Sequence, residues 1–185
     1  MEEDANSLAK RCDEAFDLFR HDCSHAVWHV IRLYKPDQPY MQANNLVSYL
    51  SKGVDWREVP LSDLSRLANQ GVLIVGGLQE HGHGHVIVVY PGYEKPKGGF
   101  YFTNKETGER QFSAPAGMYA RTMSTSLSQN PFPGAISRGD KTVRDPWPSI
   151  KFKQVKFWQY TGKKRAASQS QKEGADRSPS EKIWI

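Results

Sequence analysis

The side chains best suited to chemistry are those of Cys23 and His85, because a thiol and an imidazole together can perform nucleophilic catalysis. Cys23 lies in the first turn of a helix expected over residues 23–33, with Asp22 placed to cap it. Exposed amides and the helix dipole at such a position lower the pKa of a thiol. His85 begins an apolar run, expected to form a strand over 86–90, which would hold a base in fixed geometry.

Three histidines offer an alternative chemistry. His81, His83 and His85 alternate along the chain and would share one face of an extended segment, where three imidazoles could hold a catalytic zinc. The intervening Gly82 and Gly84 favour a polar turn instead, because metal ligands on strands need a firmer backbone. A zinc hydrolase is therefore the weaker hypothesis, and we expect no metal.

The positive net charge suggests a third function, binding to nucleic acid. The chain has 185 residues with 25 Lys and Arg against 20 Asp and Glu, a net charge of +5. Basic proteins rich in aromatic residues can bind single-stranded nucleic acid. The basic residues are scattered, however, and packing in a helix and a strand explains Trp28 and Trp158. We expect no nucleic-acid partner.

Targeting and membrane signals are absent from the sequence pattern. No apolar run approaches the roughly 20 residues that a membrane span needs. The first residues are acidic and lack the apolar core of a secretory signal peptide. Two cysteines cannot form a disulfide scaffold, and a bond between Cys12 and Cys23 would consume the nucleophile. Cys12 lies in a helical apolar stripe and is expected to be a core residue.

The order of the expected elements predicts an α+β fold with the helices packed on one side of an antiparallel sheet. Apolar periodicity predicts helices at about 8–19, 23–33, 42–51 and 62–70, and strands at 72–75, 86–90, 99–103 and 151–160. Residues 104–149 are rich in Gly, Pro, Ser and Asn and are not assigned. Residues 1–162 form the expected domain. Residues 163–185 form a basic tail that we expect to be disordered, because 163–182 contain no large apolar side chain.

Several segments resemble NlpC-like cell-wall peptidases, and more narrowly the peptidoglycan amidase effectors that type VI secretion delivers. The resemblance covers about residues 20–92. It rests on Asp22-Cys-Ser24, Gln42-Ala-Asn-Asn-Leu-Val47, Ala68-Asn-Gln-Gly-Val-Leu-Ile-Val75, Gly76-Gly-Leu78 and Gly84-His-Val-Ile-Val-Val89. His25 stands where many members have a glycine.

The resemblance implies a papain-like fold and hydrolysis of an amide bond in the peptide stem of peptidoglycan, commonly between γ-D-glutamate and diaminopimelate. Cys23 would be the nucleophile, and its backbone amide an oxyanion donor. His85 would be the general base and then the acid. A third, polar residue follows on the next strand in this family, and Asn104 is the candidate by order. No metal or organic cofactor is implied.

The resemblance also implies a biological setting. An effector made in the bacterial cytoplasm needs no signal peptide, because the secretion machinery carries it to the periplasm of the target cell. The partners implied are a component of that machinery and a cognate immunity protein that protects the producer. A phage or housekeeping wall hydrolase of the same fold is the alternative.

Overall fold

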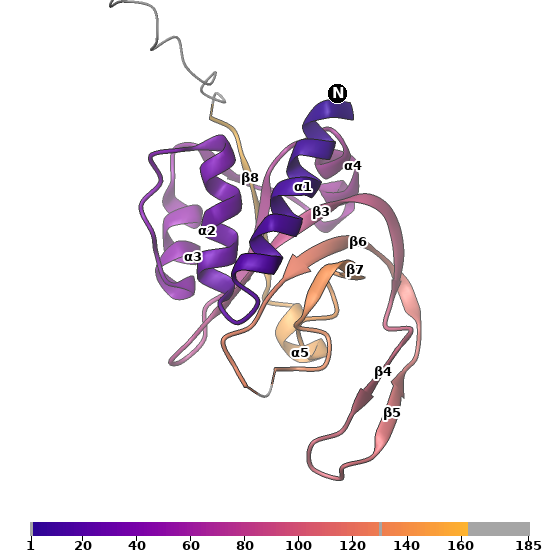
Figure 1. Ribbon diagram of the computed structural model, residues 1–185. Helices are drawn as coiled ribbons and strands as arrows, with labels where there is room; N and C mark the ends of the chain where they lie inside the picture. The colour runs from indigo at the N-terminus through magenta and orange to yellow at the C-terminus, as the bar shows by residue number, and fades with distance from the viewer. Residues whose placement is uncertain (1, 130, 163–185) are drawn as a thin grey trace, which may run out of the picture.

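The computed structural model describes residues 2–129 and 131–162 (Figure 1), and the expected tail at 163–185 lies outside them. The helical segments are α1 (Glu2–Leu18), α2 (Cys23–Tyr34), α3 (Ala43–Lys52), the 3-10 turn η1 (Leu61–Asp63), α4 (Leu64–Asn69) and α5 (Ser149–Phe152). The strands are β1 (Trp56–Glu58), β2 (Ile74–Leu78), β3 (His85–Lys97), β4 (Phe100–Thr103), β5 (Arg110–Ser113), β6 (Ala116–Ser124), β7 (Ser137–Thr142) and β8 (Lys156–Tyr160).

The main sheet has six strands in the order β1-β8-β2-β3-β6-β7, and every neighbouring pair is antiparallel. The expected α+β class with an antiparallel sheet is therefore confirmed. Strands β4 and β5 form a separate two-stranded ribbon. Figure 1 shows this ribbon projecting from the body of the molecule.

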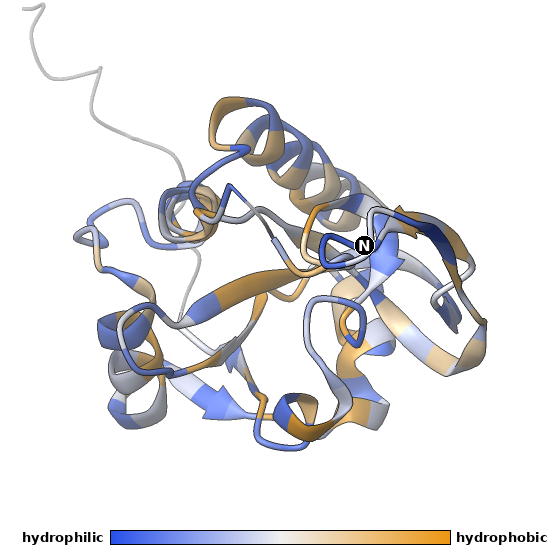
Figure 2. Cartoon of the chain, turned by 90° about the horizontal axis from the view of Figure 1, so that it is seen from below, coloured by the Kyte–Doolittle hydropathy of each residue, from blue (hydrophilic) through white to orange (hydrophobic). Residues whose placement is uncertain are grey.

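The central strand β3 is buried on both faces, which explains its continuous apolar run. Val86 and Val88 pack into a core with the inner faces of α1, α2 and α3, whereas Ile87 and Val89 pack into a second core on the opposite face. Leu64 and the rest of α4 belong to this second core. The expectation that all helices lie on one side is therefore wrong for α4. Figure 2 shows hydrophobic residues both on strands and on the sides of helices.

Helix α2 begins at Cys23 because Asp22 caps it. The Asp22 backbone is extended, and its carboxylate accepts a hydrogen bond from the backbone N–H of His25 at 3.0 Å. The apolar residues of α2 recur on one face and are buried against the sheet. The cap and the buried face together fix the position of Cys23 at the end of the helix.

Two parts of the chain differ from the sequence expectation. The strand expected at 151–160 is wrong in its first half, because Pro148 starts the short helix α5 and its carbonyl accepts from Lys151 and Phe152. Strand β8 follows only at Lys156. The unassigned region 104–149 contains β6 and β7, which complete the sheet beside β3. In the described part of the chain, no helix is long and apolar enough to cross a membrane.

Candidate active site

The Cys23 side chain is almost completely buried, at 6% exposure. Burial raises the pKa of the Cys23 thiol above its ordinary value, and the charge of Asp22 raises it further. The backbone N–H groups of Val86 and Cys23 and the hydroxyl of Ser24 lower this pKa, but by less than burial raises it. The expected lowering of this pKa by the helix start is therefore wrong for the resting structure, in which the thiol is protonated.

The His85 imidazole is held by Ser124 on β6. His85 Nε2 lies 3.0 Å from Ser124 Oγ, and Ser124 Oγ lies 2.6 Å from the carbonyl oxygen of Ala135. A carbonyl only accepts, so the single hydroxyl proton of Ser124 is donated to Ala135. Ser124 must then accept a hydrogen bond from the Nε2–H of His85. This arrangement fixes the neutral tautomer and leaves Nδ1 unprotonated, as a general base requires.

The environment of His85 favours its neutral form. Its ring packs edge-on against Trp147, with the ring centroids 5.3 Å apart. Desolvation lowers the pKa of His85 to about 4. The resting pair is therefore a protonated thiol and a neutral imidazole, and not an ion pair.

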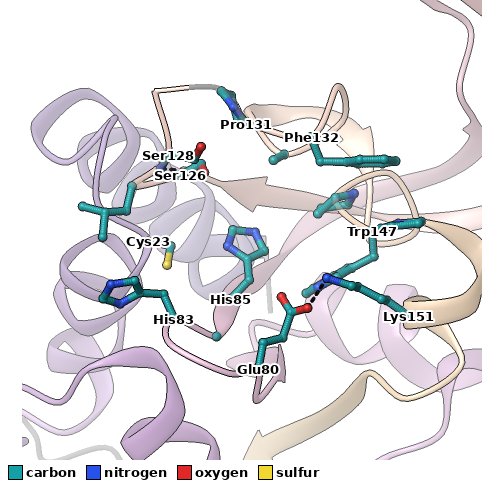
Figure 3. Close-up of a pocket in the computed structure, with 15 residues that line it drawn as sticks. Cys23, Glu80, His83, His85, Ser126, Ser128, Pro131, Phe132, Trp147 and Lys151 are labelled. Carbon is teal, nitrogen blue, oxygen red and sulfur yellow. Dashed lines mark hydrogen bonds and ion pairs between the residues drawn. The ribbon is translucent and has the colours of Figure 1, made fainter. Parts of the chain in front are cut away.

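Cys23 lies where two cavities meet. One cavity, of about 300 Å³, is lined by Cys23, His85, Trp147 and the ion pair between Glu80 and Lys151. Figure 3 shows the Cys23 side chain between those of His83 and His85 at this cavity. Because a nucleophile must reach a bond whose two ends are both bound, space on each side of Cys23 suits an enzyme that cuts within a chain.

The second cavity, of about 250 Å³, lies on the other side of Cys23 and is lined by Asp22, Ser24 and Tyr40 among others. Tyr40 stacks on His25 with their ring centroids 4.0 Å apart. The Nδ1 of His25 lies 2.6 Å from the Asp22 carboxylate, which also caps α2. His25 thus supports one wall of this cavity through Tyr40.

Asn44 on α3 holds the loop that leads into His85. Its Nδ2 donates to the carbonyl of Glu80 at 2.8 Å, and its Oδ1 accepts from the N–H of the same residue at 3.1 Å. Gly84 passes so close that a Cβ there would lie 2.3 Å from Asn44 Oδ1 and 2.6 Å from the carbonyl oxygen of Leu78. Packing therefore requires glycine at position 84, because a Cβ there would clash with these two oxygen atoms.

Of the remaining candidates, only His83 lines the cavities at Cys23, whereas Asn104 and His81 do not. Asn104 is in the turn between β4 and β5, where its Oδ1 accepts from the backbone N–H groups of Glu106 and Thr107. It lines neither cavity at Cys23. His81 and His83 are exposed. Across residues 2–129 and 131–162, no three His, Cys, Asp or Glu side chains are grouped to hold a metal ion.

Sequence reasoning missed Ser124, Tyr40 and Trp147 as parts of the site. Ser124 is separated from His85 by 39 positions, and no periodic pattern marks it. Tyr40 follows prolines in a connecting segment, and Trp147 lies in the unassigned region. The segment that contains Asn44 resembles a family motif, but the sequence does not indicate that Asn44 binds the backbone of Glu80 in the loop before His85.

The comparisons with known proteins add no relative. No model of a known protein family matches the chain, and no curated protein matches it. The geometry around Cys23 and His85 and the motifs of the sequence are therefore what points to a function.

Proposed function

We propose that this protein is a papain-like, NlpC-type cysteine amidase that cuts the peptide stem of peptidoglycan, between γ-D-glutamate and diaminopimelate. One observation carries the proposal. Cys23, at the start of a buried helix, lies at the junction of two cavities, one of which it shares with a histidine whose tautomer Ser124 fixes. These are the parts that a thiol nucleophile and its base require.

In the proposed mechanism, the Cys23 thiol gives its proton to Nδ1 of His85 as the sulfur attacks the amide carbonyl. The backbone N–H of Cys23, in the first turn of α2, would donate to the developing oxyanion, because the first N–H groups of a helix have no partner within the helix. The imidazolium then protonates the leaving amine, and a thioester remains. Water then attacks the thioester as Nδ1 of His85 takes its proton. The C–S bond breaks, the imidazolium returns the proton to the Cys23 sulfur, and the carboxylic acid is released.

The resting pKa values fit this sequence of events. Because the thiol pKa is raised and the imidazole pKa is lowered, transfer of the proton before substrate binds is unfavourable. An oxyanion held at the helix start and an amine leaving group both favour the transfer during attack. The two groups would therefore act as a base and a nucleophile in one concerted step.

The walls of the cavities match the chemistry of the stem peptide. Such a stem carries both carboxylates and amines, and the larger cavity at Cys23 offers Glu80 and Lys151 on its wall. Asp22 stands at the other cavity. The larger cavity thus offers charges of both signs and the second cavity a carboxylate, which suits a substrate that carries both carboxylates and amines.

The activity test compares wild type, Cys23→Ala and Cys12→Ala on purified peptidoglycan, with the released muropeptides identified by mass spectrometry. Wild type and Cys12→Ala should release the same fragments, because Cys12 is fully buried in the helical core. Cys23→Ala should release none while it keeps its circular dichroism spectrum. Cleavage by a folded Cys23→Ala protein would refute the proposed mechanism, and the fragment masses identify the bond.

We further propose that the enzyme is an antibacterial effector of type VI secretion, with a cognate immunity protein. The support is the motif resemblance at residues 20–92. Expression with a periplasmic signal peptide should lyse a bacterial host, whereas cytoplasmic expression should not. A neighbouring gene product that blocks the lysis would distinguish an effector from a phage or housekeeping hydrolase, for which no such protection is needed.

A further inference from the structure

A third cavity, of about 340 Å³, lies under the ribbon formed by β4 and β5. It shares Phe132, Trp147 and Pro148 with the larger cavity at Cys23, so these side chains border both cavities. The larger cavity therefore adjoins the third cavity through these residues and the second cavity through Cys23. Nothing in the proposed cleavage of the stem peptide uses the third one.

One face of the ribbon forms a wall of this cavity. Phe100 and Phe102 alternate along β4, and their register partners on β5 are Ser113 and Gln111. All four side chains share a face, because alternate residues of a strand point to the same side. Phe132, 45% exposed, adds an aromatic ring from the opposite wall.

Hydrogen-bond donors without protein partners stand among these rings. The indole Nε1 of Trp147 is buried and has no acceptor within the described part of the chain. The Gln111 amide accepts from Asn104 at 3.4 Å through its oxygen, and no described residue accepts from its Nε2. Lys97 also lines the cavity. Unpartnered donors beside aromatic rings call for a ligand with apolar C–H faces and oxygen acceptors.

We infer that this third cavity is a subsite for an N-acetylated hexosamine of the glycan strand. The C–H faces of a pyranose ring would pack on Phe100, Phe102 or Phe132, while its hydroxyl and acetamide oxygens would accept from Gln111 and Lys97. The inference rests on the proposed function, because the glycan is the polymer to which the stem peptide is attached. It also sets the direction of binding, with the sugar-proximal part of the stem lying in the cavity between Cys23 and the ribbon.

The test measures kcat/KM for the free stem peptide and for the same peptide linked to its disaccharide. Wild type should prefer the disaccharide-linked substrate by about tenfold or more, as expected for one well-packed ring contact. Phe102→Ala should remove most of that preference and leave cleavage of the free peptide unchanged. Gln111→Ala, which removes a polar group without an aromatic ring, should reduce the preference by a smaller factor.

The matched control is Tyr101→Ala. Tyr101 is 61% exposed on the other face of β4, where it packs on Phe112, so its loss should not alter the preference. Equal cleavage of both substrates by wild type would overturn the subsite, as would an equal loss on both substrates in Phe102→Ala. Binding of the disaccharide alone to Cys23→Ala, followed by NMR, separates the two proposals. Sugar binding by a wild type that cleaves neither substrate would refute the amidase and keep the subsite.

Discussion

Removal of the Ser124 hydroxyl provides the sharpest test of the catalytic geometry. Ser124 accepts from the Nε2–H of His85 at 3.0 Å and is 1% exposed, so no bulk water is available to replace it. When His85 takes the proton from Cys23, this hydrogen bond becomes one from a charged donor. Such a bond contributes about 1.5–3 kcal/mol. We therefore expect Ser124→Ala to lower kcat/KM by about 10- to 150-fold.

The Ser124 assay needs a control for lost stability. Ser137 lies opposite Ser124 on β7, is also 1% exposed, and donates to the carbonyl of Thr122 at 2.6 Å. Ser137→Ala thus removes a similar buried serine that does not contact His85. It should destabilise the protein to urea at least as much as Ser124→Ala does, with little change in kcat/KM at 25 °C.

The pH profile provides a second measurement on the same pair of variants. The hydrogen bond to Ser124 stabilises the imidazolium more than the neutral ring, so its loss should move the acid limb of kcat/KM to lower pH. Ser124→Thr, which keeps a hydroxyl, should recover part of the rate. Equal activity losses in Ser124→Ala and Ser137→Ala, with no change in either pH profile, would refute the assigned role.

Two further predictions concern stability and the loop at the site. The pKa of His85 is about 4 in the folded protein and 6.5 when unfolded, so only the unfolded chain gains this proton as the pH falls from about 6.5 to 4. Urea titrations at pH 7 and pH 4.5 measure how far the free energy of unfolding falls between these two pH values. This fall should be roughly 2 kcal/mol smaller in His85→Gln than in wild type. Equal falls in the two proteins would contradict the burial of His85. Asn44→Ala should speed hydrogen exchange at the Glu80 amide by about tenfold or more and lower kcat/KM, because that amide donates to Asn44 Oδ1. Asn44→Asp, which keeps the oxygen, is the control; unchanged exchange in Asn44→Ala would show that Asn44 does not hold the loop.

The parts of the site that local sequence determines were predictable. The Asp22 cap and the apolar spacing after it define where α2 starts, so the position of Cys23 could be inferred from neighbouring residues alone. His85 could be placed in the same way, because a fully buried strand follows it at once. Both residues depend on short-range patterns.

The partner of His85 depends on sheet order, which the sequence does not display. Order along the chain selects Asn104, since it follows the strand after β3. That strand, β4, leaves the main sheet and pairs with β5, and β6 takes the place beside β3. Ser124 at the end of β6 therefore lies against His85. The region that contains β6 and β7 has register shifts and positive-φ glycines, such as Gly139, which obscure strand periodicity.

The thiol pKa illustrates a different limit. A helix start is visible in the sequence and favours a thiolate, but the extent of burial around Cys23 is a property of the whole fold. Desolvation by the packed core is the largest influence on this group and reverses the sign of the shift. The sequence therefore indicated that backbone N–H groups at the helix start lower the thiol pKa, but not that burial raises this pKa by more.

The buried, protonated state of the Cys23 thiol has a consequence for oxidative damage. Peroxides and disulfides react with thiolates, so a thiol with a raised pKa is oxidised slowly. Cys12 is fully buried as well, and both cysteines are free. We therefore expect both thiols to stay reduced in surroundings that would oxidise an exposed thiolate. Under the proposed mechanism, the reactive anion would form only while a substrate is bound, so the packing that makes the resting thiol inert would also preserve it until the first turnover.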